Sequence, residues 1–197
     1  MISITKAEGR VLLRLFGDFN TNYNANSLSG VVGLSSRGTL NILKSLESKR
    51  ILTSKKFGKA VFYRINFSET YNIKILETLL IGEAREKAGR WEEEFKEVYG
   101  VADIVIIFGS ILKNSEKAND VDVLFVYEKN KYKKLRDFVN SKNKILYKKI
   151  HDISQTKSDL IHNLKNKNPA LINVIKEGYV LHGQDKFIEV IKNVTSS

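Results

Sequence analysis

The chain has 197 residues, no cysteine and a formal net charge of +11. This length is sufficient for one sizeable core or two small ones, and the lack of cysteine excludes disulfides and thiolate zinc sites. No apolar run is long enough to span a bilayer, and the first residues lack the apolar stretch of a signal peptide. These features predict a cytoplasmic protein with no membrane partner.

The positive charge is concentrated in the first third of the chain. Residues 1–67 contain 11 Lys or Arg and 3 Asp or Glu, a net charge of +8, whereas the rest of the chain has a net charge of +3. A basic segment at one end is typical of nucleic-acid binding, although lysine-rich chains also have basic surfaces without such a partner.

Three helices are expected in this basic third. Thr5 is placed to cap the first, because the apolar residues between Val11 and Phe16 recur at helical spacing. A short second helix is expected over 27–32, followed by a turn at 33–35. Ser35 or Ser36 then caps a third helix, whose inward side is Leu40, Leu43 and Leu46 or Ile42.

Residues 51–65 are two β-prone runs joined by a basic turn that contains Gly58, which predicts a hairpin. Three helices followed by a basic hairpin resemble the winged helix-turn-helix domains of archaeal and bacterial transcription regulators. The resemblance covers residues 4–67. Its matching residues are Leu34-Ser35 at the turn, Leu43 and Leu46 in the recognition helix, and Gly58 with Tyr63-Arg64-Ile65 in the wing.

This resemblance implies double-stranded DNA as a partner. The third helix would present its outer side chains to the major groove, while wing lysines reach phosphates or the minor groove. The DNA-binding candidates are Ser36, Arg37, Thr39, Asn41, Lys44, Lys55, Lys56 and Lys59. Two alternatives stay open: the wing lysines form only a solvated hairpin tip, or the domain serves protein docking or dimerisation.

A helical pattern continues from Glu69 to Val98, weakened by Gly82 and Gly89. We therefore expect a linker helix near 69–81 and a first helix of the next domain near 83–99, ended by Gly100. The leucine-rich face of the linker either forms a homodimer seam or packs on its own domain. The expected domains are 1–67, a linker at 68–82, and 83–197.

The most informative segment is 104–126. An apolar run from Ile104 to Phe108 predicts a buried strand, and Gly109-Ser110 ends it in a tight turn suited to phosphate. Asp120 and Asp122 then lie on one face of the next strand, about 6.6 Å apart along it. Two such carboxylates can share hard divalent cations, usually Mg²⁺. The alternative is an ordinary strand-turn-helix-strand unit with two surface aspartates.

The remainder of the chain predicts further elements. A helix is expected over 131–140, a short strand over 145–150, a helix capped by Thr156 with Asp159, and another that starts at Asn168-Pro169 and stops at Gly178. The three histidines, His151, His162 and His182, share no metal-ligand spacing, so we interpret them as ordinary residues.

A strand, a Gly-Ser turn, a short helix and Asp-x-Asp on the next strand resemble the nucleotidyltransferase superfamily that includes DNA polymerase beta, and within it the minimal nucleotidyltransferases. The resemblance covers about 83–194, and residues 179–189 resemble the ending of the minimal enzymes. Together, the two resemblances imply an α/β (α+β) chain of prokaryotic, archaeal type, in which a winged helix-turn-helix domain precedes a mixed sheet flanked by helices.

The same resemblance implies roles for the singled-out residues. Gly109 and Ser110 would hold the NTP, and Asp120 and Asp122 would bind Mg²⁺ or Mn²⁺ and serve catalysis. Active relatives generally carry a third carboxylate on a later strand. Here the segment 146–152 offers only Asp152, at its end.

The chain departs from the family pattern at two further places: 111–113, where many relatives have Arg or Gly, and Asn119, where many have Ser.

Two hypotheses about function follow. Either the chain is a DNA-binding regulator that transfers a nucleoside monophosphate to a protein or RNA acceptor, or it is a transcription regulator or antitoxin-like binding protein with a degenerate transferase domain. We expect transfer by the protein alone to be slow or absent.

Overall fold

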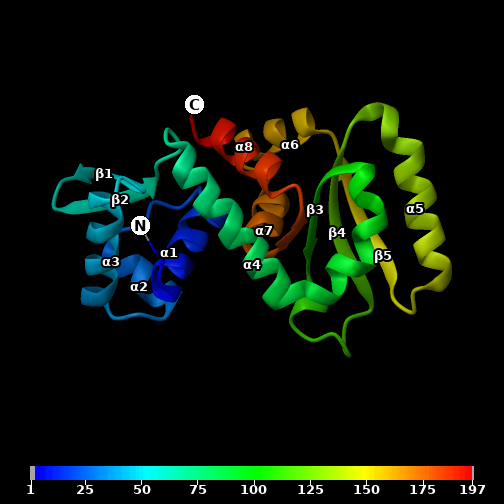
Figure 1. Cartoon of the computed structure of the whole chain (residues 1–197), viewed down its shortest axis with the longest axis horizontal. Coiled ribbons are helices and arrows are strands. Elements are labelled where there is room, and N and C mark those ends of the chain that lie inside the picture. The colour runs from blue at the N-terminus through cyan, green and yellow to red at the C-terminus, as the bar shows by residue number, and fades with distance from the viewer. Residues whose placement is uncertain (1–2, 197) are drawn as a thin grey trace. The chain divides into compact units, whose positions relative to one another are not determined.

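The computed structural model describes residues 3–196. The chain divides into two compact units, Met1–Leu79 and Leu80–Ser197, and helix α4 (Thr70–Phe95) contributes to both. Figure 1 shows helices and a hairpin in the first unit, and a helix-covered sheet in the second. Among the described residues, no helix is both long enough and apolar enough to cross a membrane.

The first unit contains three short helices, α1 (Lys6–Gly17), α2 (Ala25–Val32) and α3 (Ser36–Ser48). Each begins after a side chain that accepts a hydrogen bond from a free backbone N–H of the first turn: Thr5, Asn24 and Ser35. The caps at Thr5 and Ser35 confirm the sequence prediction. The second helix begins two residues earlier than expected because Asn24, rather than a later residue, caps it.

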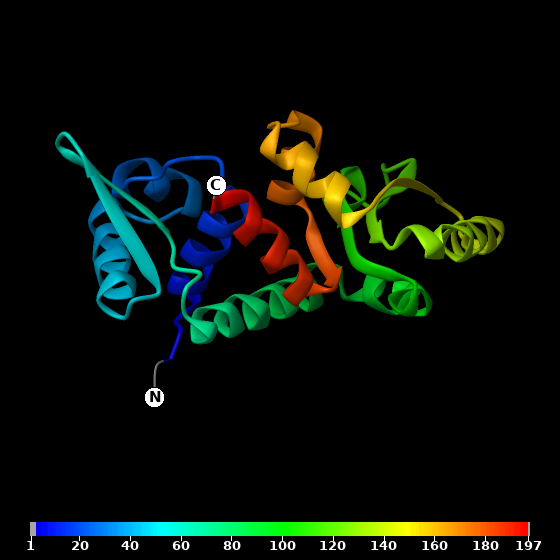
Figure 2. The same ribbon diagram turned by 90° about the horizontal axis from the view of Figure 1, so that it is seen from above.

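Strands β1 (Leu52–Phe57) and β2 (Ala60–Ile65) form the antiparallel hairpin that the sequence predicted. Gly58 occupies the turn with φ +59°, a left-handed conformation that suits glycine. Leu52, Tyr63 and Ile65 are buried on the inner face. Three helices and a hairpin in this order make a winged helix-turn-helix, and Figure 2 shows the hairpin tip reaching past the helices of its unit.

The helical stretch between residues 69 and 99 is kinked at Ala88 instead of being divided near Gly82. Helix α4 is continuous through Gly82, and its non-helical residue is Ala88, with φ −138° and ψ 19°, directly before Gly89. The expected break near Gly82 is therefore wrong, since one glycine costs a helix only about 1 kcal/mol relative to alanine. A short 3₁₀ helix, η1 (Lys96–Gly100), follows α4.

The second unit is built on a mixed four-stranded sheet. Its strands are β3 (Ala102–Phe108), β4 (Asp120–Tyr127), β5 (Lys149–Gln155) and β6 (Tyr179–His182), in the order β5-β4-β3-β6. Strand β3 pairs antiparallel with β4 and β6. Strands β4 and β5 are parallel, which requires the crossover through α5 (Tyr132–Ile145). The mixed sheet flanked by helices is confirmed.

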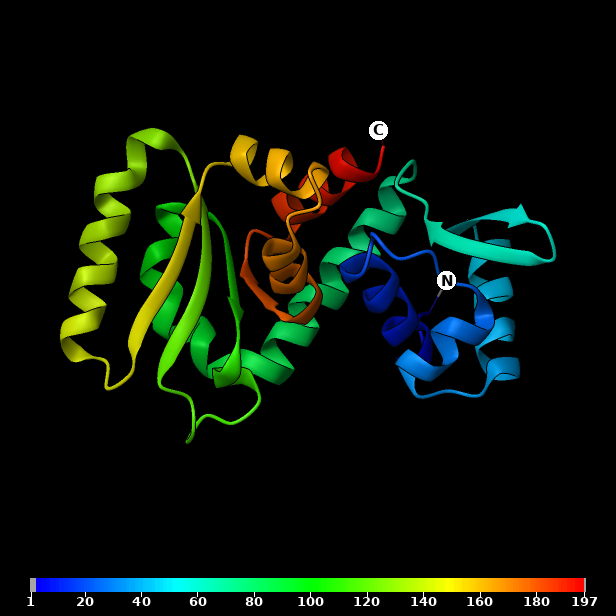
Figure 3. The ribbon, with the colours of Figure 1, turned by 180° about the vertical axis from the view of Figure 1, so that it is seen from behind.

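Helices cover both faces of this sheet. One face packs Val105, Val123 and Phe125 against the second half of α4 and against α5. The other face carries α6 (Lys157–Lys165), α7 (Pro169–Glu177) and α8 (Gln184–Thr195), which contact β3 and β4 (Figure 3). The capping pair Thr156 and Asp159 begins α6, as the sequence predicted.

The segment between α5 and β5 differs from the prediction. Helix α5 extends to Ile145 instead of ending near residue 140, and the strand begins only at Lys149. The side chains of Ile145 and Tyr147 are 75% and 96% exposed, although their apolar character indicated a strand over 145–150. The strand that neighbours β4 is therefore 149–155, which changes the residues that it places beside the aspartates.

Candidate functional site

Asp120 and Asp122 lie at the beginning of β4, on the face of the sheet that α6, α7 and α8 cover further along. The alternating residues Val121 and Val123 are fully buried on the opposite face. The two aspartates are only half-buried, while β4 is fully buried from Val123 to Val126. The same strand thus changes from polar to apolar where the helices begin to cover it, as the alternation of the sequence predicted.

Gly109 lies directly against the second aspartate. Phe108, the last residue of β3, pairs with Asp122 in the ladder, and Gly109 follows with φ +86° and ψ −159°. A Cβ atom at Gly109 would lie 2.1 Å from Oδ2 of Asp122, so this position requires glycine. The exposed Ser110 then begins the short 3₁₀ helix η2 (Ser110–Leu112). The structure therefore brings the Gly-Ser turn and the Asp pair together.

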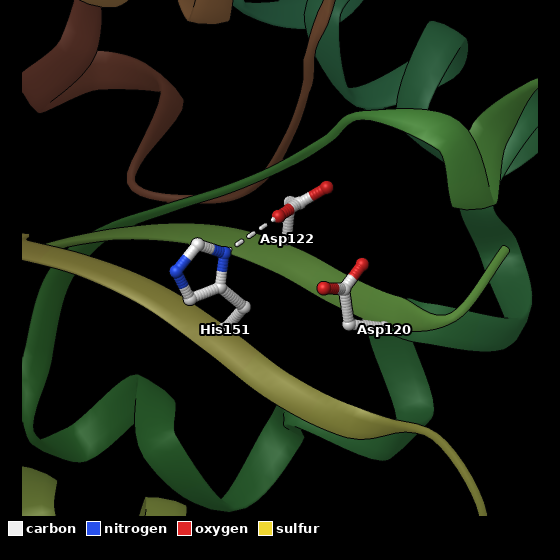
Figure 4. A group of neighbouring side chains, drawn as sticks. All are labelled: Asp120, Asp122 and His151. Carbon is white, nitrogen blue, oxygen red and sulfur yellow. Dashed lines mark hydrogen bonds and ion pairs between the residues drawn. The ribbon is translucent and has the colours of Figure 1, made fainter.

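His151 is the site residue that sequence analysis missed. The parallel register places His151 of β5 beside Asp122, and its Nδ1 lies 3.1 Å from Oδ1 of that aspartate. One ligand atom each from Asp120, Asp122 and His151 lie within 4.8 Å of one another. Figure 4 shows the three side chains projecting from β4 and β5 around a common space. The interpretation of His151 as an ordinary residue overlooked its proximity to the two aspartates.

Asp152 does not join this group. Its register partner on β4 is Val123, which faces away from the aspartates, and it lies inside β5 rather than at the end. Nη1 of Arg136 in α5 donates to both carboxylate oxygens at 2.8 Å, and the Ser154 hydroxyl also donates to Asp152. Hydrogen bonding to Asp152 raises the pKa of the Arg136 guanidinium. The catalytic role expected for Asp152 is thus not supported by its position.

Substitution of Asp152 tests this assignment. We expect Asp152→Asn to lower the free energy of unfolding by about 1–2 kcal/mol, because it weakens the charged hydrogen bonds that Arg136 donates to a carboxylate only 9% exposed. Divalent-metal binding should be unchanged in isothermal titration calorimetry. Asp137→Asn, on the exposed side of the same helix as Arg136, is the control and should alter neither quantity. Loss of metal binding with unchanged stability would show that Asp152 belongs to the metal site.

Two carboxylates and an imidazole are a donor set that fits a divalent cation. Asp122 is 19% exposed and His151 is 75% exposed, so the group is open to solvent and to a ligand. Carboxylate oxygens suit Mg²⁺ and Mn²⁺, whereas imidazole is a ligand of transition metals. The sequence predicted only the carboxylate part of this set.

The DNA-binding candidates of the first unit are exposed, with one exception. Ser36, Arg37, Asn41 and Lys44 lie on the outer side of α3, and Lys55, Lys56 and Lys59 lie on the hairpin. Thr39 is fully buried, and within the described residues its hydroxyl has no hydrogen-bond partner. Thr39 therefore cannot present its side chain to a groove, and its place among the candidates is wrong.

Comparison with known protein families gives one match, over residues 93–187. These residues match the family described as "Polymerase beta, Nucleotidyltransferase". The match begins near the end of α4 and continues into the first turn of α8, so it includes the whole sheet, the Gly-Ser turn and both aspartates. This stretch of the second unit is therefore similar to the nucleotidyltransferase family, in line with the expectation for that domain.

Among solved structures, the chain matches a protein described as "MepR, a transcription regulator of the Staphylococcus aureus multidrug efflux pump MepA". The two are 18% identical, the match covers 50% of this chain and 74% of that one, and the TM-score is 0.37. Similarity at this level carries no conclusion about function. None of the curated proteins matches the chain.

Proposed function

We propose that this chain is a cytoplasmic DNA-binding regulator whose second unit binds a divalent cation together with an NTP. The observation that carries the proposal is the convergence of Gly109, Asp120, Asp122 and His151 within a region that matches the nucleotidyltransferase family. The reaction that this geometry supports is transfer of a nucleoside monophosphate to a hydroxyl of a protein or RNA acceptor.

Each residue has a distinct task in this proposal. The turn at Gly109 and Ser110 offers backbone N–H groups and a hydroxyl to the triphosphate, and the absence of a side chain at Gly109 leaves room for the Asp122 carboxylate. Asp120, Asp122 and His151 would hold the cation. A bound cation supplies neutralisation of phosphate charge. The protein then contributes mainly positioning of the reacting groups.

One observation favours a second candidate function, a regulator or antitoxin-like partner with a degenerate transferase domain. The strand beside β4 carries His151 where a third carboxylate is expected, and Asp152 is held by Arg136 on the other face. A neutral imidazole can bind a metal but is a weaker electrostatic ligand for Mg²⁺. Nucleotide would then be bound and sensed rather than transferred.

An assay with α-labelled NTPs separates the two functions. The full-length protein is incubated with Mg²⁺ or Mn²⁺, with and without host lysate, and labelled protein or RNA is sought. We expect slow or absent transfer by the protein alone, and stronger NTP binding with Mn²⁺ than with Mg²⁺. His151→Ala should reduce the preference for Mn²⁺, whereas the surface variant His162→Ala should not. Robust labelling that disappears in Asp122→Asn establishes a working transferase.

Double-stranded DNA is the proposed partner of the first unit. Support comes from its net charge of +8 over residues 1–67 and from the exposure of Arg37, Asn41 and the three hairpin lysines. Cations that neutralise phosphates release counterions, so such binding weakens steeply with salt. Side chains of α3 would contact the bases and so determine the preferred DNA sequence, while the hairpin contributes contacts that do not depend on sequence. A homodimer through α4 remains part of this proposal.

Replacement of Lys55, Lys56 and Lys59 by alanine tests the hairpin contacts. We expect weaker binding to all duplexes and a salt dependence whose slope falls by about 1 for each lost phosphate contact. Arg37→Ala or Asn41→Ala should chiefly relax sequence preference. Gel-shift titrations at two salt concentrations measure both effects. Failure of the full-length protein to bind any duplex at low salt would leave the first unit as a protein-docking domain.

A further inference from the structure

The outer face of the hairpin has a composition that differs from its inner face. In the ladder, Lys55 lies opposite Phe62, and Thr53 lies opposite Arg64. Because side chains alternate along a strand, Phe57 shares this face with them. Leu52, Tyr63 and Ile65 occupy the inner face and form part of the core. Two phenyl rings and two cations are thus displayed together on the side away from the core.

The two rings form a pair that is open to solvent. Phe57 is 57% exposed, and its ring centroid lies 6.0 Å from that of Phe62 at an interplanar angle of 62°. Nζ of Lys55 lies 5.0 Å from the centroid of the Phe57 ring. Phe57 therefore adds little to the buried core, while its ring stays beside a cation at the surface.

A hollow of about 350 Å³ lies on this face. Its lining combines the two rings, cations and neutral hydrogen-bonding groups: Asn22, Thr53, Ser54, Lys55, Phe57, Phe62 and Arg64. Of the residues that the structure describes, those that line the hollow include no carboxylate. Nη2 of Arg64 donates to Oδ1 of Asn22 at 2.8 Å, and both residues line the hollow.

We propose that this face of the hairpin binds single-stranded nucleic acid, with unpaired bases stacked on Phe57 and Phe62. Lys55, Lys59 and Arg64 would neutralise the flanking phosphates. Aromatic rings beside cations are the combination with which proteins hold single strands, because every base has a π-face. The proposal goes beyond duplex binding and does not depend on it.

The exposed phenyl rings favour a single strand over a duplex as the ligand of this face. In a double helix the bases are stacked on one another, and the grooves expose their edges rather than their faces. Rings on the flat side of a two-stranded sheet can reach base faces only when the bases are unstacked. Cations alone would fit either form, so the exposed phenyl rings are the observation that favours unpaired bases.

The test measures fluorescence anisotropy of the full-length protein at low salt with labelled oligo(dT), oligo(U) and a duplex of the same length. Stacking on one aromatic side chain contributes about 1–3 kcal/mol, so Phe57→Ala should weaken binding of the single strands by roughly 5- to 150-fold. Binding of the duplex should change less than about twofold. The two single-stranded probes distinguish DNA from RNA as the ligand.

Three variants serve as controls. Phe57→Tyr keeps a ring and should retain affinity, whereas Phe57→Leu keeps only apolar bulk and should lose it. Tyr147→Ala removes an aromatic side chain that is 96% exposed in the other unit, and it should have no effect. Circular dichroism checks that each variant is folded, which the exposure of Phe57 leads us to expect.

Three outcomes would overturn the proposal. The first is no binding of single strands by the wild type at low salt. The second is equal single-strand affinity for the wild type and the Phe57→Ala/Phe62→Ala double variant. The third is an equal loss of single-strand and duplex affinity in Phe57→Ala, which would assign the rings to duplex binding. None of these outcomes bears on Arg37 or Asn41, so duplex binding through α3 is tested separately.

Discussion

Asp122→Asn should reduce binding of Mn²⁺ and of metal-dependent NTP by about 100-fold or more. Changes to the outer shell of a metal site typically cost about 10- to 100-fold in affinity, so loss of a direct charged ligand should cost at least as much. The substitution keeps the size of the side chain beside Gly109 but removes the negative charge. Calorimetry with Mn²⁺ alone, and then with NTP, measures the effect.

Stability provides the internal control for this experiment. Two half-buried carboxylates close together repel each other in the absence of a cation, so Asp122→Asn should leave the free energy of unfolding unchanged or slightly higher. A variant that lost both metal binding and stability would indicate a folding defect. Equal nucleotide binding by wild type and by the Asp120→Asn/Asp122→Asn double variant would refute the site assignment.

Gly109→Ala should abolish metal and nucleotide binding as completely as removal of the aspartate. The residue has φ +86°, and the added methyl carbon would lie 2.1 Å from Oδ2 and 2.9 Å from Cγ of Asp122. Either the carboxylate rotates away from its position near His151, or the turn opens. We expect a loss of roughly 1–3 kcal/mol in the free energy of unfolding as well, measured by urea denaturation.

Gly58→Ala separates the conformational strain of a positive φ from the close contact with the Asp122 carboxylate. Gly58 also has positive φ, at +59°, but an added Cβ at the hairpin turn would meet nothing within 4 Å. This variant should show only the conformational strain, about 1–2 kcal/mol, with metal binding intact. If Gly109→Ala behaves like Gly58→Ala, the close approach of the Asp122 carboxylate to the turn is not important for the site.

Local signals explain which parts of the fold could be predicted. The caps at Thr5, Ser35 and Thr156 depend on side chains that bond to backbone groups three residues away, so a short stretch of sequence contains the whole cause. The Gly-Ser turn and the alternating aspartates are local in the same way. Thr39 shows the limit, because its burial depends on which side of α3 faces the rest of its unit.

The composition of the site depended on register, which is not a local property. A shift of one residue in strand pairing exchanges the two faces of the sheet, and this is the difference between Asp152 and His151 beside Asp122. The strand was also predicted too early in the chain, because the expected range includes Ile145 and Tyr147, which are exposed. Only the parallel pairing of β5 with β4, set by packing of the whole unit, determines that the histidine faces the aspartates.

The order of strands has a consequence for how the site assembles. Strands β3 and β4 are antiparallel neighbours in the chain, so Gly109, Asp120 and Asp122 can come together in an early hairpin. His151 joins them only when β5 pairs with β4 at the edge of the sheet, and this pairing depends on the crossover through α5. Edge elements also open more readily than central ones. We therefore expect amide hydrogens of β5 to exchange before those of β4, so that the site loses its histidine reversibly while its two carboxylates remain in place.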